Sequence, residues 1–523
     1  MLPPLGDHDA LSAGFRWALP ARLNMARQVC FDWLENPERV AIIDLSGSDL
    51  SGAARRDLSY GELAAMARGL AAHLIARGVR RGDRVGVLRA QDPWCAAAHI
   101  TIWSLGAISL PLFKLFGPDA LASRLGDSGA QWVITDATGA ALLGEMPVRP
   151  LIPEAASLDL AATPPIADTG PEDPAVLIYT SGTTGAPKGA LHGHRVLSGH
   201  LPGVEISHDR LGQPGDVLWT PADWAWIGGL FDVLMPGLAI GVPVVAARLA
   251  KFTPDGARAI VEAGGVRNIF FPPTALKMLK AADMALPGLR SVASGGEPLG
   301  AEMLEWGQRA FGLSINEFYG QTECNMIASS AGSLFAPRPG CIGKPVPGHE
   351  LAVLDNGGTL LGEGIEGDIA VRRGSASMML GYWQKPEATI EKFRGDWMLT
   401  GDRGLWEAGF LRFVGREDDV ITSAGYRIGP AEIEDCLLRH PGVAMAAVIG
   451  RPDTLRTEVV RAYVVPRRGQ HLDAAMVQAH VRERLSAHLV PREVVLTDSL
   501  PMTVTGKIIR KELKRRAMEE HQE

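Results

Sequence analysis

Residues 175–189 read AVLIYTSGTTGAPKG, a short apolar run followed directly by a loop rich in glycine and hydroxyl groups. The run AVLI predicts a buried strand, and the loop contains three glycines, four serine or threonine hydroxyls and Lys188. Glycines let backbone N–H groups approach an anion, hydroxyls donate to its oxygens, and a lysine adds positive charge. We therefore expect a strand that ends in a phosphate-binding loop. For this stretch alone, the alternative is a plain surface turn. The loop is not a Walker A loop, because the spacing from Gly182 to Lys188 does not fit that pattern.

Residues 58–88 show the local pattern that predicts the fold class. Ser59 and Glu62 form a capping box, apolar residues then recur on one helical face, and Gly78 ends the helix before the apolar run 84–88. Helix followed by strand, repeated along the chain, predicts an α/β architecture. Further short β-like runs lie at 40–44, 132–135, 217–220, 242–246 and 268–271.

Later parts of the chain show a different pattern of predicted strands and helices. After about residue 350, short strands and glycine turns such as GDIAVRRG predict a β-rich part. From Asp418 onward, strand-like and helix-like segments alternate over roughly a hundred residues, the size of a small α+β domain. The apolar stretch 95–113 is nearly long enough to span a membrane, but Gly106 and Pro111 divide it. We expect a short helix and a short buried strand there.

Length and composition fit an enzyme of several structural units. The chain has 523 residues with 46% hydrophobic and 21% charged side chains, and its net charge of -7 gives no indication of nucleic-acid binding. The five cysteines are odd in number, far apart and in no C-x-x-C pair. They argue against a disulfide framework and a zinc site, and they suit a reducing cytosol. The N-terminal stretch has no targeting pattern, so we expect a cytoplasmic protein.

Five further segments of the chain, all after the glycine loop, combine glycine with charged or hydroxyl residues. They are SGGEP (294–298), YGQTE (319–323), LTGDRG (399–404), GREDDVITSAGYRI (415–428) and PMTVTGKIIR (501–510). Together with the loop after residue 178, in this order, they resemble the motifs of the acyl-adenylate-forming superfamily. The resemblance covers about residues 15–513. The segments FRWALPARLNMARQVC (15–30) and TPADWAWIGG (220–229) are most similar to the acetyl-CoA and medium-chain acyl-CoA synthetase branch.

The resemblance implies an α/β fold in two domains and a two-step ligase reaction. Residues 1–417 would form a large N-terminal domain with two α/β subdomains and a β-rich subdomain. Residues 418–523 would form a small mobile α+β domain that carries the catalytic lysine. The partners would be a carboxylic acid, ATP with Mg²⁺, and coenzyme A. An acyl adenylate would form first and then an acyl-CoA thioester, with release of AMP and pyrophosphate.

The family's nucleotide-binding roles fall on matching positions of this chain. Tyr319 would stack on adenine, Thr322 would donate to a phosphate, and Glu323 would hold Mg²⁺, which prefers oxygen ligands. Asp402 would accept from the ribose hydroxyls with Arg416 assisting. The remaining phosphate and adenine contacts would come from Thr180, Ser181, Gly182, Thr183, Thr184, Gly185, Lys188, Gly296, Glu297 and Pro298.

Lys507 is the predicted catalytic cation. Adenylation crowds negative charge between the carboxylate and the α-phosphate, and a compact ammonium placed between them would stabilise that transition state. The alternative is a solvated basic helix, which we expect for the later cations Lys511, Lys514, Arg515 and Arg516. In the second step the small domain would rotate about Asp418, Gly425 would border the pantetheine tunnel, and Arg427 would contact CoA phosphate.

Trp226, Ile227, Gly228 and Gly320 match the walls of the family's acyl pocket. Acetate-specific members have a tryptophan at the position of Gly320, so the glycine predicts room for a medium-chain, branched or aromatic acid. Residues 324–326, CNM, depart from the family's pattern after the motif glutamate and put any named acid in doubt. We expect Cys324 to fill space, and His192 and His194 to be structural.

Three rival functions stay open from the sequence. A stand-alone adenylation enzyme could load a carrier protein instead of CoA. A silent nucleotide-binding regulatory protein is disfavoured because Lys188, Glu323, Asp402 and Lys507 are all present. A luciferase-like oxygenase has no separate support in the chain.

Overall fold

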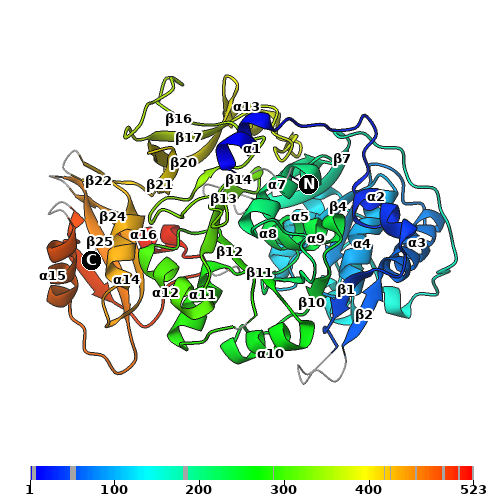
Figure 1. Ribbon diagram of the computed structural model, residues 1–523, viewed down its shortest axis with the longest axis horizontal. Helices are drawn as coiled ribbons and strands as arrows, with labels where there is room; N and C mark the ends of the chain where they lie inside the picture. Colours follow the sequence, from blue (N-terminus) through cyan, green and yellow to red (C-terminus); the bar gives the residue numbers. More distant parts are fainter. Residues whose placement is uncertain are drawn as a thin grey trace.

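The computed structural model describes residues 2, 7–47, 55–180, 187–286, 288–416, 419–423, 426–453, 456–485, 489–503 and 507–520. Two large sheets, packed helices and two smaller sheets make up the molecule (Figure 1). This arrangement confirms the predicted α/β fold.

The first large sheet is parallel in its centre and antiparallel at both edges. Its nine strands run in the spatial order β15 (Lys344–Pro345), β14 (Cys324–Ser329), β13 (Ile315–Gln321), β12 (Ser291–Gly295), β11 (Asn268–Phe270), β9 (Leu218–Trp219), β10 (Val244–Ala246), β1 (Val40–Asp44) and β2 (Arg56–Ser59). The five β-like runs predicted from the sequence include four of these strands, each near its expected position.

The second large sheet contains the strand of the glycine loop. Its seven strands run in the order β18 (Gly381–Tyr382), β8 (Lys188–Gly193), β7 (Pro174–Thr180), β4 (Ile108–Pro111), β3 (Arg84–Leu88), β5 (Trp132–Thr135) and β6 (Arg149–Leu151). Strands β7 and β8 are antiparallel, with Thr180 opposite Lys188. The glycine loop therefore joins the two strands of a hairpin at one end of the sheet.

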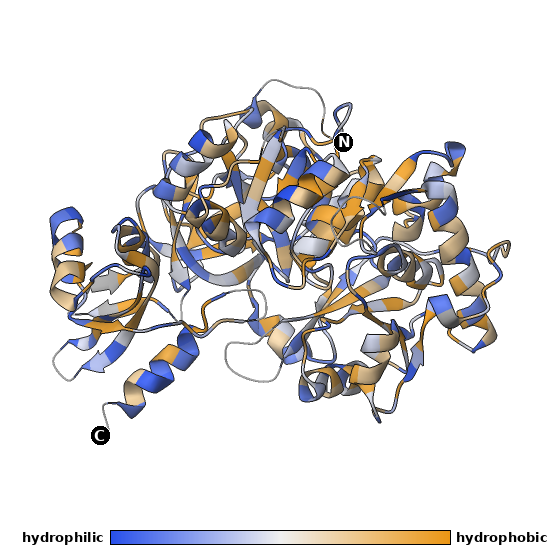
Figure 2. Ribbon diagram, turned by 90° about the horizontal axis from the view of Figure 1, so that it is seen from below, coloured by the Kyte–Doolittle hydropathy of each residue, from blue (hydrophilic) through white to orange (hydrophobic). Residues whose placement is uncertain are grey.

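Helices cover both large sheets and join them through a common core. The largest apolar cluster combines strands of both sheets with helices such as α3 and α4. In Figure 2 orange strands lie inside and bluer helical surfaces lie outside. The helices of this part are α1 (His8–Gly14), α2 (Met25–Val29), η1 (Phe31–Glu35), α3 (Tyr60–Ala76), α4 (Pro93–Ser104), α5 (Pro118–Ser128), α6 (Ala137–Leu143), η2 (Pro153–Ala155), α7 (Val196–Ser207), α8 (Ile227–Gly229), η3 (Leu230–Leu234), α9 (Met235–Ile240), α10 (Pro254–Gly264), α11 (Pro273–Ala281), α12 (Ala301–Phe311) and α13 (Pro386–Glu391).

The capping box expected at the start of α3 is present. The Ser59 hydroxyl accepts from the Glu62 backbone N–H at 3.2 Å, and the Glu62 carboxylate accepts from the Ser59 N–H at 2.9 Å. The helix ends just before Gly78, whose φ of +86° is in the left-handed region. Both local predictions are therefore confirmed, because the hydrogen bonds that set them lie within a few residues.

The apolar stretch 95–113 forms helix α4 followed by strand β4, as predicted. Both elements are buried against other parts of the chain. Among the helices of the described residues, none combines the length and apolar character that crossing a membrane requires.

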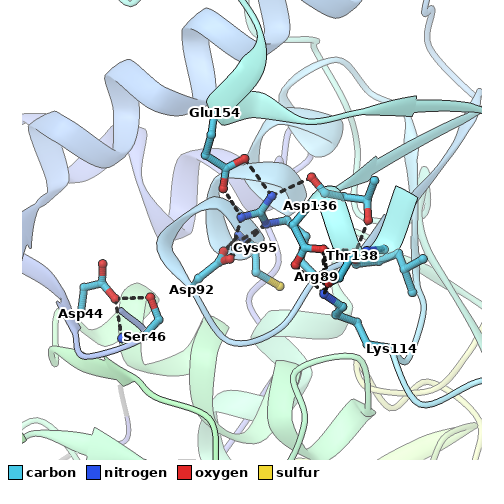
Figure 3. A network of polar contacts seen from close by, with 12 residues as sticks. Asp44, Ser46, Arg89, Asp92, Cys95, Lys114, Asp136, Thr138 and Glu154 are labelled. Atoms are coloured by element: carbon cyan, nitrogen blue, oxygen red, sulfur yellow. Dashed lines mark hydrogen bonds and ion pairs between the residues drawn. The ribbon is translucent and has the colours of Figure 1, made fainter. Parts of the chain in front are cut away.

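A polar network joins the ends of β3 and β5 to the N-terminus of α4 (Figure 3). The buried Arg89 donates to the Thr135 carbonyl at 2.7 Å and to Asp92 at 2.6 Å, and it also pairs with Glu154. Asp92 in turn accepts from the Cys95 N–H and caps α4. The two carboxylates and the carbonyl that accept from Arg89 offset the cost of burying its positive charge.

The two smaller sheets follow in chain order. The β-rich part contains β16 (Leu351–Leu354), β17 (Gly367–Arg372), β19 (Phe393–Arg394), β20 (Trp397–Glu407) and β21 (Phe410–Arg416). The C-terminal part contains β22 (Ile421–Ser423), β23 (Tyr426–Ile428), β24 (Val443–Asp453), β25 (Thr457–Pro466) and β26 (Glu493–Leu496), with helices α14 (Pro430–Leu438), α15 (Ala474–Arg484) and α16 (Arg510–Glu519). Figure 1 shows this part in orange and red beside α12. The domain boundary between residues 417 and 418 lies outside the described residues and stays a prediction.

Candidate active site

The residues predicted to contact adenine and ribose meet where the first large sheet approaches the β-rich part. Tyr319, at the end of β13, donates its hydroxyl to the Asp402 carboxylate on β20 at 2.5 Å. Arg416 on β21 is the cross-strand partner of Asp402. Burial raises the pKa of Asp402, while Arg416 and the Tyr319 hydrogen bond oppose that shift. An aromatic face, a carboxylate and a guanidinium thus come from three strands to one place.

The predicted metal ligand, Glu323, lies in the turn that connects β13 to β14. Glu323 is buried and accepts from the Tyr382 hydroxyl at 2.5 Å. The Lys188 ammonium lies 5.3 Å from the centroid of the Tyr382 ring. Tyr382 therefore connects the lysine of the glycine loop to the carboxylate. The sequence gives no signal for this role, because Tyr382 reaches the site only by pairing β18 with β8.

Lys392 is a second residue at the site that the motifs do not identify. It ends α13, and its ammonium donates to the Thr400 carbonyl at 3.2 Å. The Gln321 side chain donates to the same carbonyl at 2.8 Å. Burial lowers the pKa of Lys392, and the charges of Glu323 and Asp402 oppose that shift.

The predicted catalytic lysine reaches the large part of the molecule. The Lys507 ammonium lies 5.9 Å from the centroid of the Trp226 ring. Gly296, with φ +103°, faces both side chains, because a Cβ there would lie 3.6 Å from Lys507 Cε and from the Trp226 ring. Burial lowers the pKa of Lys507, and Glu297 and Asp402 oppose that shift. The side chain is still solvent-accessible, so protein surrounds it without packing tightly on it.

The acyl-pocket residues lie beside this lysine, with one correction. Ile227 and Gly228 are buried at the start of the α8 helix, and a Cβ on Gly228 would lie 2.6 Å from the Trp226 ring. A Cβ on Gly320 would lie 2.5 Å from the Met326 backbone nitrogen. The expectation that Gly320 leaves free space is therefore wrong in this structure. The glycine is required because β13 and β14 approach closely there.

Residues 324–326 have structural partners that explain the departure from the family pattern. Asn325 donates to both carboxylate oxygens of the buried Asp232, at 2.9 and 2.8 Å. Cys324 lies 3.3 Å from the Ser377 hydroxyl, and burial raises the pKa of its thiol to about 11. Such a thiol carries little thiolate and fills space, as expected.

The two histidines after the glycine loop are also structural. Burial lowers the pKa of His192 to about 3 and that of His194 to about 4. The His194 ring accepts from the Met25 backbone N–H at 3.1 Å. Neutral, enclosed rings of this kind agree with the expectation from the sequence.

Thr180 is described and ends β7. Several other predicted site residues lie outside the described residues: Ser181, Gly182, Thr183, Thr184, Gly185, Asp418, Gly425 and the side chain of Arg427. Their roles stay predictions.

Comparisons with known proteins identify the arrangement. The profile of the AMP-binding enzyme family matches residues 32–383, and that of the AMP-binding enzyme C-terminal domain matches residues 432–507. The chain belongs to the AMP-binding enzyme family. The matched ranges include the glycine loop, SGGEP (294–298), YGQTE (319–323) and Lys507, whereas LTGDRG (399–404) and GREDDVITSAGYRI (415–428) lie between them.

Relatives of this AMP-binding enzyme include ligases from distant organisms. The chain is 33% identical to acetyl-coenzyme A synthetase of Bacillus subtilis, over 83% of this chain and 81% of the relative. It is 33% identical to the human mitochondrial acyl-coenzyme A synthetase ACSM2B, over 84% of this chain and 81% of the relative. The crystal structure of ATP-bound MatB from Rhodopseudomonas palustris superimposes with a TM-score of 0.83 at 28% identity, covering 94% of this chain and 98% of MatB.

The AMP-binding enzyme is thus an acid–thiol ligase that uses ATP, Mg²⁺ and CoA and forms an acyl adenylate. The donor set fits Mg²⁺, because Glu323 offers a carboxylate, a hard oxygen ligand. Within the described ranges no three His, Cys, Asp or Glu side chains gather to hold a metal ion. Glu323 would therefore hold Mg²⁺ together with the phosphate oxygens of ATP, and Thr322 would donate to a phosphate.

Proposed function

We propose that this AMP-binding enzyme activates a monocarboxylic acid larger than acetate, of the medium-chain, branched or aromatic class. The observation that carries the proposal is the apolar wall beside the Lys507 ammonium. The Trp226 ring centroid lies 5.9 Å from that ammonium, and the buried Ile227 follows Trp226 at the start of α8. Apolar walls of this kind suit a hydrocarbon chain or ring.

The residue roles inferred from the family remain part of the proposal. Lys507 stabilises the charge that develops during adenylation, and its ammonium enters beside Gly296 and Trp226. Glu323 holds Mg²⁺, Thr322 donates to a phosphate, and Asp402 accepts from the ribose hydroxyls with Arg416 assisting. Asp418 is the hinge, while Gly425 and Arg427 serve CoA. The division into residues 1–417 and 418–523 and a cytoplasmic location belong to the same proposal.

The test is AMP release by the purified protein with ATP, Mg²⁺ and CoA, across acids from acetate to dodecanoate and across branched and aromatic acids. A maximum at an acid larger than acetate supports the proposal. A maximum at acetate overturns the substrate class but not the ligase.

Two rival functions give different results in the same assay. Acid-dependent pyrophosphate exchange without CoA-dependent AMP release indicates an adenylation enzyme that loads a carrier protein. Absence of both exchange and release indicates a silent nucleotide-binding protein.

A further inference from the structure

Lys392 holds an unusual position for a lysine, because it is half-buried between two functional segments. It follows α13 directly, and the chain continues into β19 of the β-rich part. An ammonium has three donors. Among the described residues its only hydrogen-bond partner is the Thr400 carbonyl, and no carboxylate of that part of the chain lies within ion-pairing distance.

Thr400 on β20 connects Lys392 to the segment that contains Gln321. Its carbonyl accepts from Lys392 and from Gln321, the residue before Thr322 and Glu323. Its hydroxyl accepts from the Asp402 backbone N–H at 3.1 Å. One residue on β20 therefore holds the ends of two predicted nucleotide-binding segments in register, and Lys392 is bonded to it.

Charged side chains of the predicted nucleotide site act on the Lys392 ammonium. Glu323 and Asp402 are both buried carboxylates, and both attract the ammonium. Lys188 and Arg416 are the cations that face it from β8 and β21. Two buried carboxylates in one wall are costly unless nearby positive charge compensates them. Lys392 supplies such charge, and its hydrogen bond to the Thr400 carbonyl fixes where that charge lies.

We propose that Lys392 is a positioning residue for bound ATP: its ammonium holds the Thr400 carbonyl and adds positive charge near Glu323 and Asp402, the residues assigned to Mg²⁺ and ribose. The inference rests on the proposed function, because it assigns Glu323 and Asp402 to Mg²⁺ and ribose. It adds a cation that lies outside all the motif segments and acts through these residues.

The experiment compares three replacements that separate charge from hydrogen bonding. Lys392→Met removes both, Lys392→Gln keeps a donor for the Thr400 carbonyl without charge, and Lys392→Arg keeps the charge. Lys385→Met is the matched control, because Lys385 flanks the same helix, is similarly half-buried and faces Asp127 at 3.8 Å. The measurements are calorimetric binding of Mg²⁺-ATP without acid or CoA, steady-state constants for ATP and for the acid, and thermal unfolding.

We expect Lys392→Met and Lys392→Gln to weaken ATP binding about tenfold or more, with the KM for the acid and the unfolding temperature nearly unchanged. Lys392→Arg should restore most of the affinity, and Lys385→Met should match the wild type. Unchanged ATP binding in Lys392→Met overturns the inference. So does full recovery in Lys392→Gln, which would make the hydrogen bond sufficient, or a fall in unfolding temperature that accounts for the loss.

Calorimetry keeps this inference separate from the proposed function. If the wild type turns over no acid but Lys392→Met binds ATP more weakly, only the proposed substrate and reaction fail. If turnover is as proposed and ATP binding is equal in all variants, only the role of Lys392 fails.

Discussion

The ammonium of Lys507 lies 5.9 Å from the centroid of the Trp226 ring, although the two residues are far apart in the sequence. Lys507 follows the small C-terminal sheet, whereas Trp226 precedes helix α8 of the large part. The small part is therefore oriented so that its lysine enters the candidate site. This orientation is the one that the first half-reaction requires in the proposed mechanism.

Replacement of Lys507 should separate the two half-reactions. Lys507→Ala should reduce adenylation by several orders of magnitude if the ammonium contributes about 4 kcal/mol or more to the transition state. Conversion of preformed acyl adenylate to thioester should continue, because the lysine leaves the site for that step. Pyrophosphate exchange and single-turnover thioester formation measure the two steps. Lys511→Ala, four residues along and exposed, is the control; equal loss in both half-reactions of Lys507→Ala would refute the separation.

A contact between the two parts predicts a second separation. The Asp435 carboxylate on α14 lies against the start of α12, because a Cβ on the N-cap residue Gly300 would lie 1.7 Å from one of its oxygens. Burial raises the pKa of Asp435, and the nearby Ala301 N–H opposes that shift. Asp435→Ala removes this interaction between the carboxylate and the helix N-terminus from the present orientation, which should lose about 0.5–2 kcal/mol. Adenylation should therefore slow severalfold relative to thioester formation.

Gly300→Ala tests the same contact from the other side. A Cβ on Gly300 would lie 1.7 Å from an Asp435 carboxylate oxygen, and the glycine has φ +74°. The variant should slow adenylation as Asp435→Ala does, and the double variant should be little worse than either one. Additive effects in a double-mutant cycle would show that the two residues act independently.

The Tyr319–Asp402 hydrogen bond predicts a pH effect on ATP binding. Burial raises the pKa of Asp402, and the Tyr319 hydroxyl lowers it. As pH falls through this raised pKa, the carboxylate gains a proton and should accept ribose hydroxyls less well. Tyr319→Phe keeps the ring but loses the hydroxyl, so the acidic loss of ATP affinity should move to higher pH. Tyr463→Phe, whose hydroxyl bonds to Leu513 in the small part, should leave the profile in place.

Gly320→Trp distinguishes the structural role of this glycine from a role in acid selection. Because backbone atoms of Met326 occupy the place of a side chain, the variant should lose about 1–3 kcal/mol or more of folding stability. Activity should fall for all acids. Thermal unfolding and the acid profile provide the readouts; a stable variant that now prefers acetate would show that residue 320 does set the pocket length.

The sequence by itself determined the local elements and the reaction class. The capping box at Ser59 and the helix–strand division of residues 95–113 depend on neighbours in sequence, so their patterns predict them. The motif segments with Lys507 indicated the family because their order and spacing are preserved along the chain. Nucleotide chemistry was therefore predictable before any contact was known.

Tertiary structure alone decided which other residues surround these motifs. Tyr382 reaches Glu323 through an edge-strand pairing, and Lys392 reaches Thr400 where β19 pairs with β20. Gly320 has its role because another strand fills the space beside it, which reversed the expectation from the sequence. The Tyr382–Glu323 contact joins two different sheets, so spacing along the chain carries no information about it. The contacts of Lys392 and Gly320 depend on how β19 pairs with β20 and β13 with β14.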